Sequence, residues 1–325
     1  MIHFSVIYRQ KYQWLKQLLV ICFIVFGISY CWQLPALAHP HDYTDYYQYS
    51  DHVEMSEQAP YESNDAISDR TRTASPPDIQ RILDRNKLIV AVLNSDNEPF
   101  FMADDADKDN LVGLDAKIAR GLADALGVQV EFNREADTFN GVVDQVYQLK
   151  ADIAISKLSQ TLSRAQRVKF SRPYVNMRQG LLVNRVQLAQ QANGKGTVQT
   201  IRDFTGDVGV IEGSSYVGFL QQKFPQATVR EYENWNDIVT AVNEGEIAAA
   251  YRDELEVKKE IIKNPDASLL LQTIALTDTK DQIAMALPWD SLHLQAFVNQ
   301  YLDTSGMDYN ADLVLEEFSE YIASN

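Results

Sequence analysis

A plan of alternating strands and helices occurs twice in this chain of 325 residues. In its first copy, apolar runs predict buried strands at 88–93, 128–132 and 151–155. The helix between the first two strands has an apolar residue every four positions, at Leu114, Ile118, Leu122 and Leu126. Strands that alternate with helices favour a parallel sheet built from right-handed crossovers. The sequence therefore predicts an α/β lobe that begins near residue 78.

The second copy predicts another α/β lobe, with strands at 207–211, 228–232 and 247–251. A helical segment after Trp289 would return to the first lobe. Apolar segments at 181–185 and 281–287 would cross between the lobes as hinge strands. We thus expect an α/β clamshell in which residues 78–180 and 288–325 form lobe 1 and residues 186–280 form lobe 2.

The N-terminal segment has the pattern of an export signal. Residues 1–38 carry three basic residues and no acid, then an apolar run at 18–28 and a small-residue cleavage pattern ending at Ala38. We expect cleavage after Ala38 and a periplasmic protein, with an uncleaved membrane anchor as the alternative. Residues 39–77 are acidic and rich in Tyr, which predicts a disordered linker ending at Pro76 and Pro77.

Charge and residue counts exclude several kinds of chemistry. The chain has 45 acidic and 29 basic residues, a net charge of -16, which disfavours nucleic acid and anionic membrane surfaces as partners. Both cysteines, Cys22 and Cys31, lie in the export signal, and His293 is the one histidine of the predicted folded body. We expect no disulfide, no catalytic triad, no metal and no cofactor there. Metal capture by the linker histidines (His39, His41 and His52) is a weaker interpretation, because Pro40 lacks the amide hydrogen that such chelation needs.

The loop after the strand at 151–155 carries the first candidate binding residues. Thr161 is a suitable N-cap for a helix running toward Val168, which places Arg164 in the first turn, where a cation is unfavourable. Arg164 could be a surface residue paired with an acid. Alternatively, with amides near Ser159 and Thr161, it could form a bidentate site for a carboxylate.

The second lobe offers complementary groups. Ser214 and Ser215 follow a strand and open a helix, where they could donate to a ligand or simply cap the helix. Asp253, just beyond the strand at 247–251, could hold an ammonium or cap the helix at 254–263. An acid in one lobe facing Arg164 in the other would match the zwitterion of an amino acid.

Three segments resemble the extracellular solute-binding proteins of family 3, which serve ABC importers of polar amino acids: LVGLDAKIARGLADALGVQVEF at 111–132, SKLSQTLSRAQRVKF at 156–170 and KFSRPYV at 169–175. The resemblance runs from about Leu88 to the C-terminus and implies the clamshell fold of periplasmic binding proteins. It implies that Arg164 binds a ligand carboxylate and Asp253 its ammonium. It also assigns donors to Ser159, Thr161, Ser214 and Ser215, and a packing role to Phe139.

Four positions depart from the family pattern, and one of them is Ser163, which stands where the family has a Glu before the binding arginine. Asn94 and Asn97 stand where the family often has an Asp and an aromatic residue, and Lys157 replaces a small residue. Losing an acid and gaining a lysine disfavours a cationic ligand, so we expect a neutral polar or acidic amino acid. The alternative for Lys157 is a side chain that extends into solvent.

These observations predict a monomeric binding protein that captures a small amino acid between its lobes and delivers it to a membrane permease of the ABC type. One alternative is an enzyme on the same scaffold, such as a dehydratase of the cyclohexadienyl type, with Glu98, Asp115 or Glu212 as its general acid or base. Asp115 could instead cap the helix that it begins, and Glu212 could face solvent. Another alternative is a membrane-tethered sensor that keeps its first 38 residues.

Overall fold

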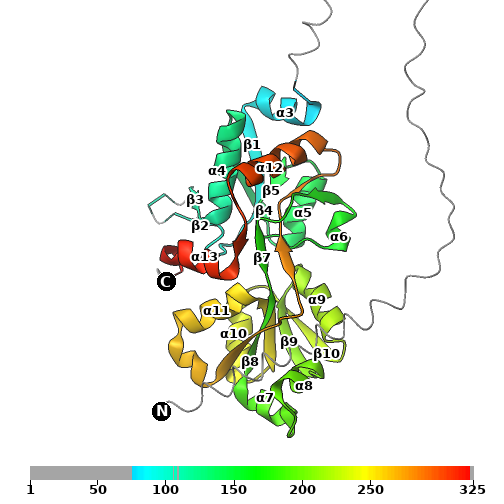
Figure 1. Cartoon of the computed structure of the whole chain (residues 1–325), viewed down its shortest axis with the longest axis vertical. Helices are drawn as coiled ribbons and strands as arrows, with labels where there is room; N and C mark the ends of the chain where they lie inside the picture. The colour runs from blue at the N-terminus through cyan, green and yellow to red at the C-terminus, as the bar shows by residue number, and fades with distance from the viewer. Residues whose placement is uncertain (1–74, 105, 108–109, 323–325) are drawn as a thin grey trace, which may run out of the picture. The chain divides into compact units, whose positions relative to one another are not determined.

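A computed structural model describes residues 75–104, 106–107 and 110–322 (Figure 1). The predicted export signal and most of the predicted linker lie outside these residues. Helix α3 (Pro77–Arg85) begins at the last residue of the predicted linker, with Pro76 as its N-cap. Proline is favoured at the first helical position, so Pro77 starts this helix, which the sequence patterns did not predict. Within the described part of the chain, no helix combines the length and apolarity needed to cross a membrane.

The first lobe is built on a five-stranded sheet with the order β4-β1-β5-β14-β6. Its strands are β1 (Lys87–Leu93), β4 (Gln129–Ala136), β5 (Ile153–Ala154), β6 (Val168–Phe170) and β14 (Ala286–Pro288). Strand β1 runs parallel to β4 and β5, as the alternating pattern predicts, while β14 pairs antiparallel with β5 and β6. The connecting helices are α4 (Leu114–Leu126) and α5 (Phe139–Tyr147), and two short strands, β2 (Met102–Ala103) and β3 (Leu111–Val112), precede α4.

The second lobe repeats this architecture with a sheet of order β10-β9-β11-β8-β12. Its strands are β8 (Gln179–Asn184), β9 (Gly206–Ile211), β10 (Ala227–Tyr232), β11 (Ala249–Asp253) and β12 (Leu271–Ala275). Its helices are α7 (Arg185–Ala192), α8 (Thr197–Arg202), α9 (Ser215–Lys223), α10 (Trp235–Glu244), α11 (Glu254–Lys263) and the short 3-10 helix η1 (Pro265–Leu269). Strand β9 is parallel to β10 and β11, which confirms the second α/β unit.

A small sheet links the two lobes. Strand β7 (Val175–Met177) pairs with β13 (Asp281–Ile283) and β15 (Tyr309–Asn310), and β8 follows β7 almost directly. The predicted crossing segment at 181–185 instead lies in β8 and at the start of α7, where β8 pairs on both sides within the second sheet. An apolar run of this length is typical of any fully buried strand, so the sequence pattern alone does not locate the crossing.

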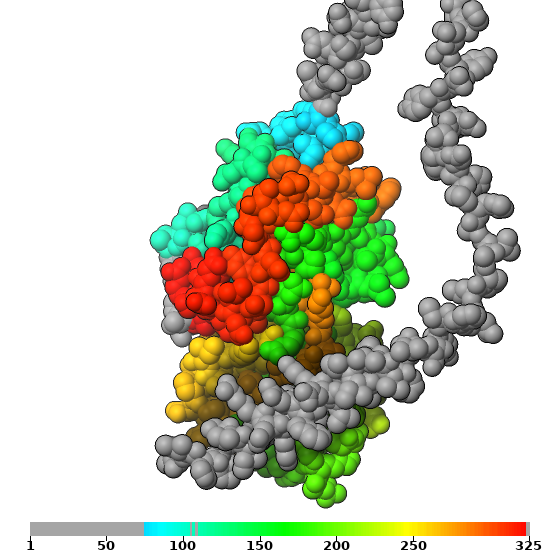
Figure 2. Space-filling view, viewed as in Figure 1, coloured from blue at the N-terminus to red at the C-terminus, as the bar shows by residue number. Residues whose placement is uncertain are grey.

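The C-terminal helices pack on the first lobe. They are α12 (Leu292–Thr304), α13 (Ala311–Glu317) and the 3-10 helix η2 (Ser319–Tyr321). Leu294, Val298 and Val314 join the buried core of that lobe, and the His293 backbone amide donates to Asp78 Oδ2 of α3 at 2.8 Å. In Figure 2 the surface of these helices, in red and orange, lies directly against the cyan and green surface of the first lobe.

Helix α6 (Leu162–Ala165) is much shorter than predicted. The sequence favours a helix running toward Val168, but Val168 begins β6 and pairs with Pro288 of β14. The apolar residues after α6 therefore satisfy their backbone groups in a sheet rather than in a longer helix. This early end turns the chain back into the sheet immediately after Arg164.

Candidate functional site

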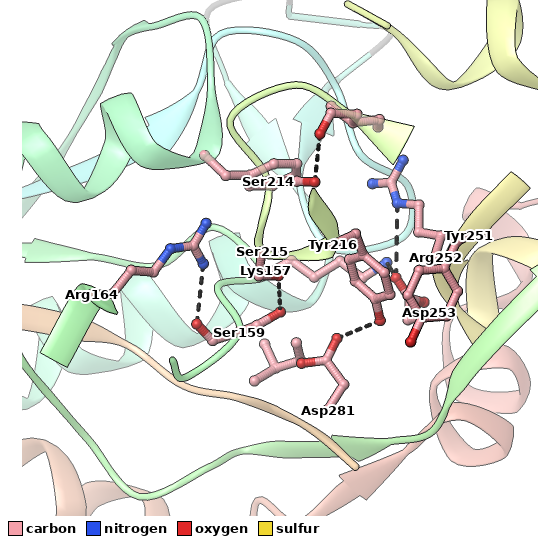
Figure 3. Close-up of a pocket in the computed structure, with 13 residues that line it drawn as sticks. Lys157, Ser159, Arg164, Ser214, Ser215, Tyr216, Tyr251, Arg252, Asp253 and Asp281 are labelled. Atoms are coloured by element: carbon pink, nitrogen blue, oxygen red, sulfur yellow. Dashed lines mark hydrogen bonds and ion pairs between the residues drawn. The ribbon is translucent and has the colours of Figure 1, made fainter. Parts of the chain in front are cut away.

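A small pocket lies between the two lobes, with a volume of about 20 Å³, enough for about one water molecule. Lobe 1 contributes Phe139, Lys157, Ser159 and Arg164, and the linking strand β13 contributes Asp281 and Ile283. Lobe 2 contributes Ile211, Ser214, Ser215, Tyr216, Tyr251, Arg252 and Asp253. Figure 3 shows these polar side chains converging on one space. The structure thus brings together seven of the ten residues singled out from the sequence.

Arg164 is a buried cation that is bonded only to neutral groups. Thr161 caps the short helix α6 by accepting from the Arg164 backbone amide at 3.2 Å, and this places the Arg164 side chain over the pocket. The guanidinium donates to Asn140 Oδ1 at 3.0 and 3.2 Å and to the Ser159 carbonyl at 3.1 Å. Burial lowers its pKa to about 10, and the negative charge of Asp281 opposes that change. Arg164 therefore remains charged at neutral pH, and it makes no ion pair within 4 Å with any residue that the structure describes.

The predicted hydroxyl donors have different positions. Ser215 Oγ donates to Ser159 Oγ at 2.9 Å, a contact between the lobes inside the pocket. Ser214 Oγ donates to the Ile211 carbonyl at 2.6 Å. Thr161 does not line the pocket, because its hydroxyl is used as the cap of α6. Its contact with a ligand stays a prediction.

The three other candidate residues of lobe 1 lie in different places. Phe139, the first residue of α5, is buried and lines the pocket. Asn97 lies in a neighbouring cavity rather than in the pocket itself. Asn94 is exposed and its amide donates to Asp137, so it lines neither space.

Lys157 does not extend into solvent, so that alternative is wrong. Its side chain is only 3% exposed, with Nζ at 2.9 Å from Asp253 Oδ2 and 2.7 Å from Glu256 Oε1. The ammonium also lies over the ring of Phe100, 4.8 Å from its centroid. These contacts cross from the loop after β5 to helix α11 of the other lobe, so sequence neighbours give no indication of them.

Asp253 caps helix α11, as one of the two interpretations predicts. Its Oδ1 accepts from the Glu256 backbone amide at 3.1 Å, and its Oδ2 faces Lys157. Burial would raise the pKa of Glu256, but the charges of Lys157, Lys259 and Arg252 hold it well below its usual range. Asp253 and Glu256 are therefore a buried acid pair that is already neutralised by lysines and arginine.

Asp281 is a pocket residue that the sequence reasoning missed. Its Oδ2 accepts from the Tyr216 hydroxyl at 2.7 Å, and the Ser159 hydroxyl also acts on this carboxyl as a hydrogen-bonding group. Burial raises its pKa to about 6, and the bond from Tyr216 partly offsets this. Other missed residues are Tyr216, Tyr251, Arg252 and Glu256. A usable signal existed for Glu256, because an acid three residues after an Asp N-cap is a capping pattern.

The candidate general acids do not gather in the pocket. Glu98 lines the neighbouring cavity and pairs with Lys263 at 2.7 Å, and Glu212 is exposed. Asp115 is not a cap, because Gly113 holds that position in α4. Instead, Asp115 accepts from the Lys157 backbone amide and the Tyr174 hydroxyl, both at 2.7 Å. Among the described residues, no cluster of three or more His, Cys, Asp or Glu side chains is arranged to hold a metal ion.

A larger cavity of about 460 Å³ adjoins the pocket and shares Phe139, Ile211 and Arg252 with it. Its lining contains three cations (Arg252, Lys259 and Lys263) and six acids (Asp96, Glu98, Asp137, Glu233, Glu256 and Glu260), so acids outnumber cations there. The ring of Trp235 also lines it, with the Arg252 guanidinium 5.4 Å from the ring centroid. A solute held in the pocket could extend into this polar space.

The chain is similar to known proteins of two kinds, a lytic murein transglycosylase and solute-binding proteins. It is 29% identical over 167 residues to membrane-bound lytic murein transglycosylase F of Cellvibrio japonicus, covering 50% of this chain and 32% of that protein. It is 22% identical over 165 residues to ABC transporter arginine-binding protein 1 of Escherichia coli, covering 50% and 63%. The chain thus spans about one third to two thirds of the length of these relatives.

A solved structure of the substrate-binding protein AbpA from Streptococcus pneumoniae, bound to L-arginine, is also similar. The TM-score is 0.62 at 25% identity, with 76% of this chain and 100% of that chain covered. Residues 88–304 match the family described as bacterial extracellular solute-binding proteins, family 3, a range that includes the main sheets of both lobes and strands β7 and β13. The chain therefore belongs to family 3 of the bacterial extracellular solute-binding proteins.

Proposed function

We propose that this protein captures a small amino acid, or an acid with the same carbon skeleton, between its lobes and delivers it to an ABC-type permease. The relatives that bind arginine support this class of solute. The export signal supports a periplasmic location, with a retained membrane anchor as the alternative. We propose no catalytic step, because none of the candidate acids lines the small pocket beside Arg164.

The observation that carries this proposal is the state of Arg164. A buried guanidinium has five N–H donors, and here its acceptors are one amide oxygen and one carbonyl oxygen. A carboxylate in the pocket could accept two parallel hydrogen bonds from such a group. Ser159 and Ser215 would lie beside that carboxylate as hydroxyl donors, and Phe139 would pack on the solute.

The charges nearby favour a neutral polar or acidic side chain over a cationic one. Lys157, Arg252 and Lys259 outnumber the acid pair that they surround, so a cationic group held against these buried ion pairs would meet like charge, although the adjoining cavity is lined by more acids than cations.

Calorimetry with a solute panel tests this preference. The panel contains glutamate, glutamine, asparagine, arginine and lysine, each with its 2-hydroxy analogue. We expect glutamate, glutamine and asparagine, or their analogues, to bind at least about tenfold more tightly than arginine, lysine or theirs. Tighter binding of the arginine or lysine skeletons would contradict the proposed preference.

Closure of the lobes is proposed to involve the β7–β13 pair as the crossing strands and Gly213 as a contact point. The Gly213 carbonyl accepts from the Asn140 backbone amide of lobe 1 at 3.0 Å. A Cβ on Gly213 would lie 2.8 Å from Thr138 Cβ, which is closer than two carbon atoms can pack. Any side chain here would therefore separate the lobes.

Gly213→Ala is expected to weaken solute binding by about tenfold, because overpacking of this size costs about 1–3 kcal/mol in the closed form. Gly306→Ala is the matched control, since Gly306 has a similar φ of +64° but no atom within 4 Å of its added Cβ. Calorimetry should give wild-type affinity for the control. Equal affinities for the two variants would show that Gly213 does not limit closure.

A further inference from the structure

We propose that Lys157 occupies the place of a ligand ammonium, so that the preferred solutes are carboxylic acids without an α-amino group. Suitable solutes are 2-hydroxy and 2-oxo acids of amino-acid size. The inference rests on the carboxylate site proposed at Arg164, and it specifies what the rest of the pocket accepts.

The acid pair that could hold a ligand ammonium is already fully used. Asp253 Oδ2 faces Lys157 at 2.9 Å, and Asp253 Oδ1 accepts from the Glu256 backbone amide. Glu256 Oε1 faces Lys157 at 2.7 Å, and its Oε2 faces Lys259 at 3.0 Å. All four carboxylate oxygens therefore have a donor, and three of the four contacts come from two lysine ammonium groups, those of Lys157 and Lys259.

The local charge also opposes a second ammonium. Three cations (Lys157, Arg252 and Lys259) surround two acids (Asp253 and Glu256), and all five side chains are at least nine-tenths buried. With the amide of Asn97 oriented to match its neighbours, its nitrogen donates to Glu256 at 3.2 Å and its oxygen accepts from Arg252 at 3.0 Å. An α-ammonium brought to this cluster would add like charge in a site with little water to screen it.

The backbone of Lys157 is an independent observation. Its φ is +48°, in the left-handed region that favours glycine, and its amide is held by Asp115 Oδ2 at 2.7 Å. A long side chain at such a position is unfavourable unless its contacts compensate, and backbone strain of this kind often marks a functional site. The contacts of Lys157 with Asp253 and Glu256 provide that compensation.

One other carboxylate faces the pocket. Asp281 is buried and accepts from the Tyr216 hydroxyl, and it lies near enough to Arg164 to influence the pKa of the guanidinium. An ammonium bound to Asp281 would therefore share this acid with the guanidinium that holds the carboxylate. A 2-hydroxyl group needs no such charge, because Ser159 and Ser215 lie beside it as hydrogen-bonding partners.

The experiment compares amino acids with their 2-hydroxy analogues in wild type, Lys157→Gly and Lys157→Met. Calorimetry with L-glutamate against 2-hydroxyglutarate, and with L-glutamine against its 2-hydroxy analogue, gives a preference ratio for each protein. We expect wild type to favour the hydroxy acids by at least about tenfold, and both variants to shift the ratio toward the amino acids by about a hundredfold. Glycine suits the positive φ, and methionine keeps the length of the side chain without its charge.

Asn193→Gly is the matched control, because Asn193 also has a positive φ of 41° but is exposed and lines neither cavity. Its ratio should equal that of wild type. A wild-type preference for amino acids, or a ratio unchanged in both Lys157 variants, would overturn the inference while leaving the carboxylate site intact. If Asp281→Asn then removed the preference for amino acids, Asp281 would be the ammonium acceptor instead. Absence of binding by every member of the panel would overturn the carboxylate site and, with it, this inference.

Discussion

Replacing Arg164 with alanine should weaken the binding of every carboxylate solute by about a hundredfold. Hydrogen bonds to a charged group contribute about 1.5–3 kcal/mol each, and a bidentate pair lost in a buried pocket amounts to roughly 3 kcal/mol or more. Arg164→Lys keeps the charge but loses the planar fork, so it should recover only part of this affinity. Calorimetry with the best-bound member of the solute panel measures the three dissociation constants.

Arg167→Ala provides the control for this experiment. Arg167 lies three residues further along, pairs with Asp144 at 2.6 Å on the surface and stacks over Tyr147. Its replacement should leave solute affinity unchanged. If Arg164→Ala bound solutes as tightly as wild type, the carboxylate role of Arg164 would be refuted, whatever the lysine variant did.

Asp115→Ala should lower the free energy of unfolding by roughly 3 kcal/mol near pH 6. Asp115 is 1% exposed and accepts from the Tyr174 hydroxyl and the Lys157 amide. Its removal leaves two buried donors without partners, each at a cost of about 1–3 kcal/mol. Asp115→Asn retains one acceptor and should lose less. Denaturant unfolding monitored by circular dichroism gives both values.

The contribution of Asp115 to the free energy of unfolding should decrease as the pH rises. Burial raises the pKa of Asp115 from 3.8 to about 7, although its bonds to Tyr174 and Lys157 oppose the change. Between about pH 4 and pH 7 the folded state therefore binds more protons than the unfolded chain. The stability of wild type relative to Asp115→Asn should fall across this range, by about 4 kcal/mol at most, and stay level above it.

Asp124→Asn, at an exposed position on the same helix, should show no such trend relative to wild type. A difference between wild type and Asp115→Asn that stays constant from pH 4 to pH 8 would mean that the carboxyl titrates equally in both states.

The sequence located Arg164 correctly within the fold but misjudged its surroundings. A capping threonine three residues earlier fixes the direction of the Arg164 side chain, and such a local contact can be read from the chain. Lys157 was assigned to a side-chain pocket or to solvent. It instead pairs with Glu256, 99 residues away, across the gap between the lobes. No local pattern carries that information.

Local rules determined the two α/β units and several of their helix ends. The spacing of apolar residues predicts α4, and Gly127 predicts where it ends. Asp253, directly before a helical segment, predicts the N-cap of α11. These features depend on residues within a few positions of one another, and their physical cause is the satisfaction of backbone groups at helix ends.

Tertiary structure alone decided where the chain crosses between lobes and how the pocket is charged. The crossing lies at β7 and β13 because Val175 and Asn176 pair with residues more than a hundred positions away. Asp281 reaches the pocket from that crossing strand, and Lys157 reaches Asp253 only once the lobes meet. The sequence by itself therefore determined that this protein has two lobes and placed Arg164 in the loop that reaches the pocket between them. Which charges surround Arg164 was decided by buried ion pairs between distant residues, because their energy depends on burial that exists only in the folded protein.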